Sequence, residues 1–173
     1  MTFTTILLLG LLASGESPAP LDGPHRTFED DLLKELPGKW RLRGSMAGGE
    51  AVDHVVEVDW VLNHQFLRIH ETAAQPSKSG MRYEAMVFLG RDNTSERYVA
   101  HWLDVFGGRW SETLGYGRRD GATLELLFEY PDGPFRTSLR WDAAHRTWRW
   151  LMRQKAPTGE WKDFLDATLS AEH

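Results

Sequence analysis

The chain of 173 residues contains no cysteine. That absence excludes disulfide bonds, thiol catalysis, zinc–thiolate sites and iron–sulfur clusters. An excess of positive charge is lacking too, because the formal net charge at pH 7 is −5. Proteins that bind nucleic acid usually carry a basic patch, so no nucleic-acid partner is predicted. What the chain does have is eight tryptophans and sixteen glycines in an otherwise ordinary globular composition.

Long hydrophobic runs are also missing, and the longest apolar stretch spans only residues 6–13. Eight residues of helix reach about 12 Å, whereas the hydrocarbon core of a bilayer is about 30 Å thick. No transmembrane segment is therefore predicted. The small residues Ala13-Ser14-Gly15 suit signal-peptidase cleavage, so residues 1–15 are predicted to be a signal peptide, although residues 1–5 lack Lys and Arg. The predicted location is secreted or periplasmic, with the cytoplasm as the alternative.

A linker and a short helix are expected next. Residues 17–24 contain three prolines and a glycine, which is typical of a linker, and we place it over 16–26. Thr27 can cap a helix with Asp30 three residues on, and Leu32, Leu33 and Leu36 supply an apolar stripe before Pro37-Gly38. The sequence predicts one helix over 28–36, at the start of a single domain over 27–173.

From residue 39 onward the chain alternates apolar and polar residues, with turn signals every 8 to 15 residues. Residues 54–62 and 135–141 are clear examples. About ten antiparallel strands joined by hairpins follow from this pattern. Such a meander exposes its edges unless it closes, so we predict an all-β fold: a single antiparallel barrel of eight to ten strands. The tryptophans lie mainly on the apolar phase, which predicts an aromatic-lined interior.

The first predicted strand opens with Gly38-Lys39-Trp40, directly after the short helix. This Gly-x-Trp resembles the calycin signature of lipocalins and fatty-acid-binding proteins, in which the Trp closes one end of the barrel. The order of residues 60–67, 88–92 and 98–102 is similar to that of the bacterial domain-of-unknown-function family fifteen seventy-nine, a lipocalin-like group. The family usually has a Gly pair where this chain has Asn63-His64, and a Tyr where it has Arg91. The resemblance implies a barrel with a cavity and no established reaction.

Polar residues on the apolar phase of predicted strands are the candidate site residues. His54 is in phase with Trp60, Glu112 with Trp110, and Asp163 with Leu165. A polar group inside a barrel costs about 1–3 kcal/mol unless it is hydrogen-bonded, so each needs a partner, a water or a ligand. Two interpretations stay open: a polar anchor for a ligand, or a core residue that the protein itself satisfies. The predicted ligand-binding residues are His54, Trp60, Trp102, Trp110, Glu112 and Trp150.

Metal and cofactor sites are not predicted. His54, His70 and His101 lie on three separate predicted strands without the close spacing of metal ligands. The resemblance of lipocalin-like barrels to haem-binding nitrobindins leaves haem as a minor alternative.

Three function classes remain compatible with the sequence. The favoured one is a barrel that binds a small apolar or amphipathic molecule. A packed structural or interaction domain and a barrel enzyme that pairs His54 with Glu112 or Asp163 are the alternatives. The volume of the cavity and the distance from His54 to a carboxylate discriminate among them.

Overall fold

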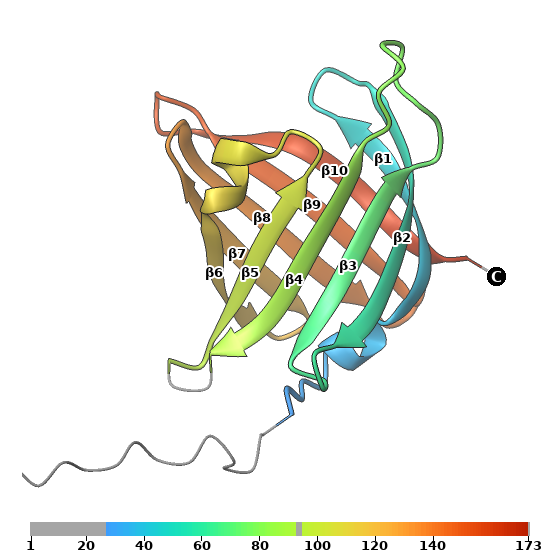
Figure 1. Ribbon diagram of the computed structural model, residues 1–173, viewed down its shortest axis with the longest axis vertical. Coiled ribbons are helices and arrows are strands. Elements are labelled where there is room, and N and C mark those ends of the chain that lie inside the picture. Colours follow the sequence, from blue (N-terminus) through green and yellow to red (C-terminus); the bar gives the residue numbers. More distant parts are fainter. Residues whose placement is uncertain (1–26, 93–94, 173) are drawn as a thin grey trace, which may run out of the picture.

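The protein folds into a closed antiparallel β-barrel (Figure 1). The computed structural model describes residues 27–92 and 95–172, so the predicted signal peptide over 1–15 and linker over 16–26 lie outside the described residues. In this part of the chain the strands are β1 (Gly38–Met46), β2 (Ala51–Val61), β3 (Phe66–Ala73), β4 (Glu84–Asp92), β5 (Arg97–Asp104), β6 (Leu114–Asp120), β7 (Thr123–Tyr130), β8 (Gly133–Asp142), β9 (Thr147–Lys155) and β10 (Trp161–Ala171). Two 3₁₀ turns accompany them, η1 (Leu33–Glu35) and η2 (Gly108–Glu112).

Strand order around the barrel follows the sequence. Each strand pairs antiparallel with the next, and β1 pairs with both β2 and β10, which closes the sheet. Leu42 of β1, for example, lies opposite His54 on one side and Leu169 on the other. The predicted all-β meander is confirmed, with ten strands. No helix in the described residues is long and apolar enough to cross a membrane.

The predicted helix over 28–36 is wrong, because this segment forms only the 3₁₀ turn η1. Asp30, and not Thr27, begins the turn: its Oδ1 accepts the backbone N–H groups of Leu32 and Leu33 at 2.8 and 2.9 Å. Pro37 and Gly38 follow before a second turn can form. A helix nucleus is unfavourable, and a segment this short cannot repay it by propagation. Its apolar residues serve instead to close the barrel.

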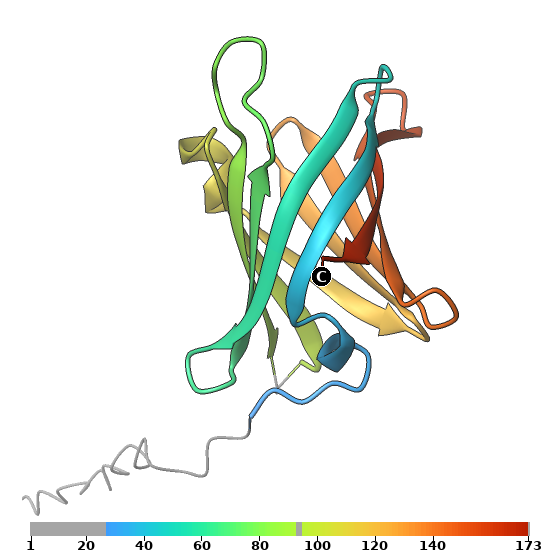
Figure 2. The ribbon, with the colours of Figure 1, turned by 90° about the vertical axis from the view of Figure 1, so that its right-hand side faces the viewer.

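The end of the barrel beside η1 is the closed end (Figures 1 and 2). Leu33 and Leu36 are fully buried there. Trp40 is 6% exposed and donates its Nε1–H to the carbonyl of Leu36 at 2.7 Å. Trp148 is buried and its Nε1 lies 3.4 Å from the carbonyl of Glu35. Trp40 therefore closes this end beneath the N-terminal segment, as the calycin comparison implies.

The corner between β2 and β3 belongs to the same closed end. Leu62, Asn63 and His64 have φ of 52°, 53° and 63°, a conformation that favours glycine. Here the bulkier residues make contacts that glycine cannot: the His64 ring stacks on Trp60 with centroids 3.9 Å apart. The His64 carbonyl accepts the backbone N–H of Phe28 at 2.9 Å. These contacts offset the strain of the corner and attach the N-terminal segment to it.

Asp30 ties that segment to the other wall of the barrel. Its carboxylate accepts a hydrogen bond from the Tyr98 hydroxyl of β5 and forms an ion pair with Arg119 of β6 at 3.0 Å. These two contacts add to the hydrogen bonds from the two backbone N–H groups. Burial acts to raise the pKa of Asp30, but these hydrogen bonds and the Arg119 charge outweigh it and hold the pKa below its usual value. Burial and the Asp30 carboxylate raise the pKa of Tyr98 to about 12.

Trp40→Ala is expected to lower the free energy of unfolding by about 3–5 kcal/mol, because a buried indole and its hydrogen bond are lost. Trp161→Ala is the matched control, since Trp161 lies half-buried on the outer surface beside Arg136. Denaturant unfolding of both variants checks this. A Trp40→Ala loss no larger than that of the control means that Trp40 does not hold the closed end.

Asp30→Asn is expected to cost about 1.5–3 kcal/mol near neutral pH, because hydrogen bonds to a charged acceptor are lost. A carboxyl whose folded-state pKa is depressed stabilises the fold above its unfolded pKa and loses this contribution as the pH falls through the folded pKa. The difference between wild type and Asp30→Asn should therefore shrink below about pH 4. Denaturant unfolding at several pH values measures it. Asp31→Asn, at a side chain that is 90% exposed, is the control, and a difference that stays constant into acid contradicts the account.

Candidate functional site

A cavity of about 870 Å³ occupies the half of the barrel away from η1. Side chains of eight aromatic residues line it: Tyr83, Trp102, Phe106, Trp110, Phe128, Tyr130, Phe135 and Phe164. Below the cavity the barrel is packed solid. Trp150 is 2% exposed, lies against Trp102 with centroids 5.7 Å apart, and donates its Nε1–H to Thr137 at 2.7 Å. One half of the interior is thus core and the other half is open space.

The entrance to the cavity is apolar and reaches solvent. Met81, Phe106, Trp110 and Phe164 line the cavity and are also among the large exposed apolar side chains of the protein. The loop between β3 and β4 and the turn η2 stand at this end of the barrel (Figures 1 and 2). A group of exposed apolar side chains around an opening is typical of a site that binds a ligand or a partner.

His54 and Glu71 form a polar pair in the wall of the cavity. His54 Nδ1 lies 2.5 Å from Glu71 Oε1, and the side chains are 17% and 4% exposed. The two residues come from inward positions of neighbouring strands: His54 of β2 is opposite Ala73 of β3, and Glu71 lies two residues along. A side chain as buried as Glu71 needs a partner, and the imidazole is the partner that the structure gives it.

This contact decides which nitrogen of His54 is available. An ionised carboxylate can only accept hydrogen bonds, so Nδ1 carries a proton toward Glu71, and in the neutral ring Nε2 keeps its lone pair. Nε2 makes no hydrogen bond to any residue that the structure describes. Tyr83 stacks on the ring with centroids 5.5 Å apart and an interplanar angle of 26°. His54 thus offers the cavity an oriented hydrogen-bond acceptor.

Asp104 is a second carboxylate in the cavity. It lies on the inward phase of β5 and its Oδ1 accepts the backbone N–H of Phe106 at 2.9 Å. Burial, followed by the charge of Asp104, raises the pKa of Tyr130 to about 12. Burial raises the pKa of Tyr83 as well, and the charges of Glu71 and Asp104 add to the effect. Both phenols therefore stay neutral and can donate or accept a hydrogen bond.

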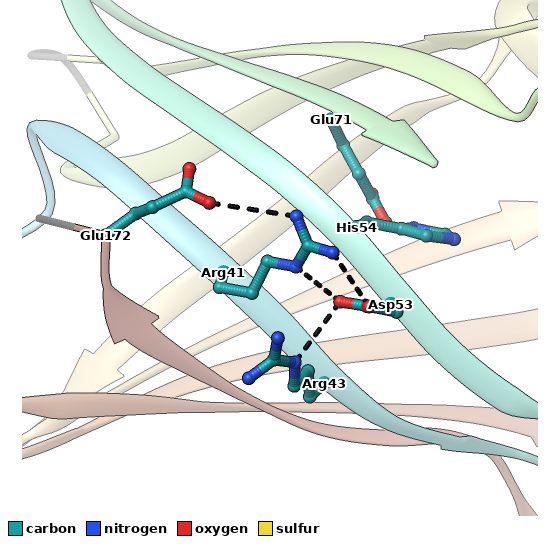
Figure 3. A network of polar contacts seen from close by, with 6 residues as sticks. All are labelled: Arg41, Arg43, Asp53, His54, Glu71 and Glu172. Carbon is teal, nitrogen blue, oxygen red and sulfur yellow. Dashed lines mark hydrogen bonds and ion pairs between the residues drawn. The ribbon is translucent and has the colours of Figure 1, made fainter. Parts of the chain in front are cut away.

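A separate ionic network covers the outside of the same wall (Figure 3). Asp53 contacts Arg41 at 2.5 Å and Arg43 at 3.3 Å, and Arg41 also lies 3.7 Å from Glu172. Successive residues of a strand point to opposite faces, so Asp53 faces this network while its neighbour His54 faces the interior. The hydrogen bond and charge of Arg41, with those of Arg43, hold the pKa of Asp53 low.

The structure places the six predicted ligand-binding residues in different surroundings. His54, Trp102 and Trp110 line the cavity. Trp60 points inward but belongs to the closed end, where it packs against Phe28 and His64. Trp150 lies beneath the cavity in the packed core, and Glu112 is exposed in η2.

The carboxylate partners predicted for His54 are wrong for two backbone reasons. Glu112 follows Gly107 and Gly108, whose φ of 57° and 49° lead into η2 and interrupt the alternation. In β6, which follows η2, the inward positions are occupied by glycines and not by a carboxylate. The Phe128 ring fills the space beside Gly115, where a Cβ would lie 2.4 Å from the ring. Asp163 precedes a bulge at Phe164, which moves it to the outer face, where it pairs with Arg153 at 2.7 Å.

Glu71 and Asp104 are not among the predicted site residues, although a signal for both exists in the sequence. Leu67, Ile69 and Glu71 alternate, and so do Ala100, Trp102 and Asp104. Extending each pattern by one residue places a carboxylate on the inner face. In the described residues, no three His, Asp or Glu side chains gather closely enough to hold a metal ion.

Comparison with solved structures finds designed β-barrels and a protein from M. tuberculosis among the similar chains. The chain is similar to a redesigned β-barrel (12% identity, TM-score 0.45, covering 82% of this chain and 96% of that one). It is similar to a de novo designed fluorescence-activating β-barrel (14% identity, TM-score 0.40, 83% and 100%). A third is Rv2717c from M. tuberculosis (14% identity, TM-score 0.48, 83% and 99%).

No curated protein matches the chain. A family profile does match, over residues 26–170, which contain β1 to β9 in full and all of β10 except its last residue, Ala171. The chain therefore belongs to the family described as protein of unknown function (DUF1579).

Proposed function

We propose that the protein binds a small apolar or amphipathic molecule in the open half of the barrel. The observation that carries this proposal is a cavity of about 870 Å³ with aromatic walls and the His54–Glu71 pair inside it. Small-molecule sites usually measure about 300–1,000 Å³ and combine apolar walls with a few polar groups. A packed interaction domain, the second class that the sequence left open, would instead have an interior filled by side chains.

The polar pair is best explained as an anchor. A ligand hydroxyl that donates to His54 Nε2 satisfies the acceptor that the protein leaves without a partner in the described residues. The apolar part of the ligand then lies against Trp102, Phe128 and Tyr130. Burial of the apolar part supplies affinity at about 25 cal/mol per Å², and the hydrogen bond supplies orientation.

A barrel enzyme is the second candidate, and the same pair is the observation that favours it. A carboxylate that orients an imidazole through Nδ1 leaves Nε2 as a base, which is the arrangement used in acid–base catalysis. The two candidates differ in the fate of the bound molecule. Recovery of a probe unchanged after incubation supports binding, whereas conversion that depends on His54 supports catalysis.

Phenylbutanol and butylbenzene are suitable probes, since they share an apolar body and differ in one hydroxyl group. Both should change the tryptophan fluorescence, because Trp102 and Trp110 line the cavity. His54→Phe should weaken phenylbutanol about tenfold, the value of one hydrogen bond, and change butylbenzene by less than about twofold. His70→Phe is the matched control, because His70 lies on β3 but pairs with Glu84 at 2.7 Å away from the cavity.

The outcomes separate the function classes. If neither probe changes the fluorescence at millimolar concentration, the packed-domain alternative replaces the binding proposal. If both probes bind but His54→Phe weakens them equally, the cavity binds ligands and His54 is not the anchor.

A further inference from the structure

We infer that the polar end of the ligand is cationic, an organic ammonium group, and that the cavity discriminates against carboxylates such as fatty acids. This inference rests on the proposed function, because it names the chemical class of ligand for the same site. Three features of the cavity support it: the sign of the charges that line it, the lack of basic partners for some of them, and the attraction of aromatic ring faces for cations.

Every charged residue that lines the cavity is acidic, although the carboxylate of one of them, Asp53, points to the outer face. The four are Glu50, Asp53, Glu71 and Asp104, and no Lys or Arg in the described residues lines it. Lys78 and Arg82 belong to the loop between β3 and β4, where both side chains are exposed and water screens their charge. Three further basic groups beside lining residues have partners of their own. Arg109 of η2 pairs with Asp132, while Arg136 and Lys155 lie over the Trp161 ring on the outer surface.

Two of the four carboxylates contribute little negative charge to the cavity. Asp53 is compensated by Arg41 and Arg43 on the outer face. Glu50 is exposed in the turn between β1 and β2, where water screens its charge. Glu71 and Asp104 remain as the charges that a bound molecule meets inside the barrel.

The protonation state of His54 does not reverse this result. With a neutral imidazole, both Glu71 and Asp104 are uncompensated. With a protonated imidazole, the His54–Glu71 pair at 2.5 Å is neutral as a unit and Asp104 is still uncompensated. Among the described residues, the Asp104 carboxylate accepts one hydrogen bond, from the backbone N–H of Phe106. In either state the cavity carries negative charge.

The aromatic walls favour the same sign. The face of a tyrosine, tryptophan or phenylalanine ring attracts a cation within about 6 Å, and ammonium recognition by aromatic cages uses this attraction. Tyr83 and Tyr130 stay neutral under the combined effects of burial and the carboxylate charges, so their rings keep this property. A carboxylate ligand finds neither a cation to pair with nor a favourable ring face, and it is repelled by Asp104.

The experiment compares phenylbutylammonium, phenylbutanol and phenylbutanoate, which share one apolar body. At about pH 7.5 the first is a cation and the last an anion. Calorimetric titration should show the ammonium compound binding at least about tenfold more tightly than the carboxylate, with the alcohol between them. Asp104→Asn should reduce the ratio of the two affinities to about threefold or less, because it removes the charge and keeps the shape.

Asp120→Asn is the matched control. Asp120 is exposed at the last residue of β6, near the closed end, so the variant makes the same change in net charge far from the cavity. It should leave the ratio unchanged. Glu71→Gln serves as a second variant, and it should also lower the ratio. Circular dichroism and thermal unfolding identify any variant that fails to fold.

The two proposals fail in distinguishable ways. If none of the three compounds binds, the proposed function fails, and this inference with it. If the alcohol binds and the carboxylate binds as tightly as the ammonium compound, the ligand class is wrong while the binding function survives. A preference for the cation that neither Asp104→Asn nor Glu71→Gln reduces overturns the assignment to these carboxylates.

Discussion

Ten strands closed into a barrel enclose more space than their inward side chains can fill, and this constraint governs the molecule. About eight strands give an interior that side chains just fill, and wider barrels must plug the space or leave a cavity. In this chain one end of the barrel is plugged and the other end holds a cavity. The N-terminal segment, held by Asp30 and Trp40, closes one end with leucines, while the opposite half stays open. The cavity is therefore a consequence of strand number and of where the plugging segment lies.

Polar residues inside such a space are costly, so their arrangement is informative. Thr137 is satisfied by Trp150, which shows how the packed half treats a buried polar group. Glu71 is satisfied by His54, but this leaves the second ring nitrogen of His54 facing the cavity without a protein partner in the described residues. Asp104 adds a charge with no basic neighbour among the lining residues. In the packed half, buried polar groups are hydrogen-bonded by the protein itself. In the open half, hydrogen-bonding and charged groups remain that a ligand can satisfy.

Alternation along the strands is sufficient to predict the barrel and the inward position of His54, whereas the closing role of Trp40 is implied by the resemblance of Gly38-Lys39-Trp40 to the calycin signature. Alternation fails where the backbone departs from a regular strand. The glycines at 107 and 108 and the bulge at Phe164 each break the alternation, so the pattern assigns Glu112 and Asp163 to the wrong face. The partner of His54 cannot be identified in this way, because strand register is set by pairing across the whole sheet and a single strand does not contain it.

The most direct test of the central claim, one closed half and one open half, is fluorine NMR of the protein labelled with fluorotryptophan. The eight tryptophans are distributed over both halves and the outer surface, and single Trp→Phe variants assign their signals. Addition of phenylbutanol should shift the signals of Trp102 and Trp110, which line the cavity, and leave those of Trp40 and Trp148 unchanged. Shifts confined to Trp40 and Trp148, or no shift in any signal, would contradict the account.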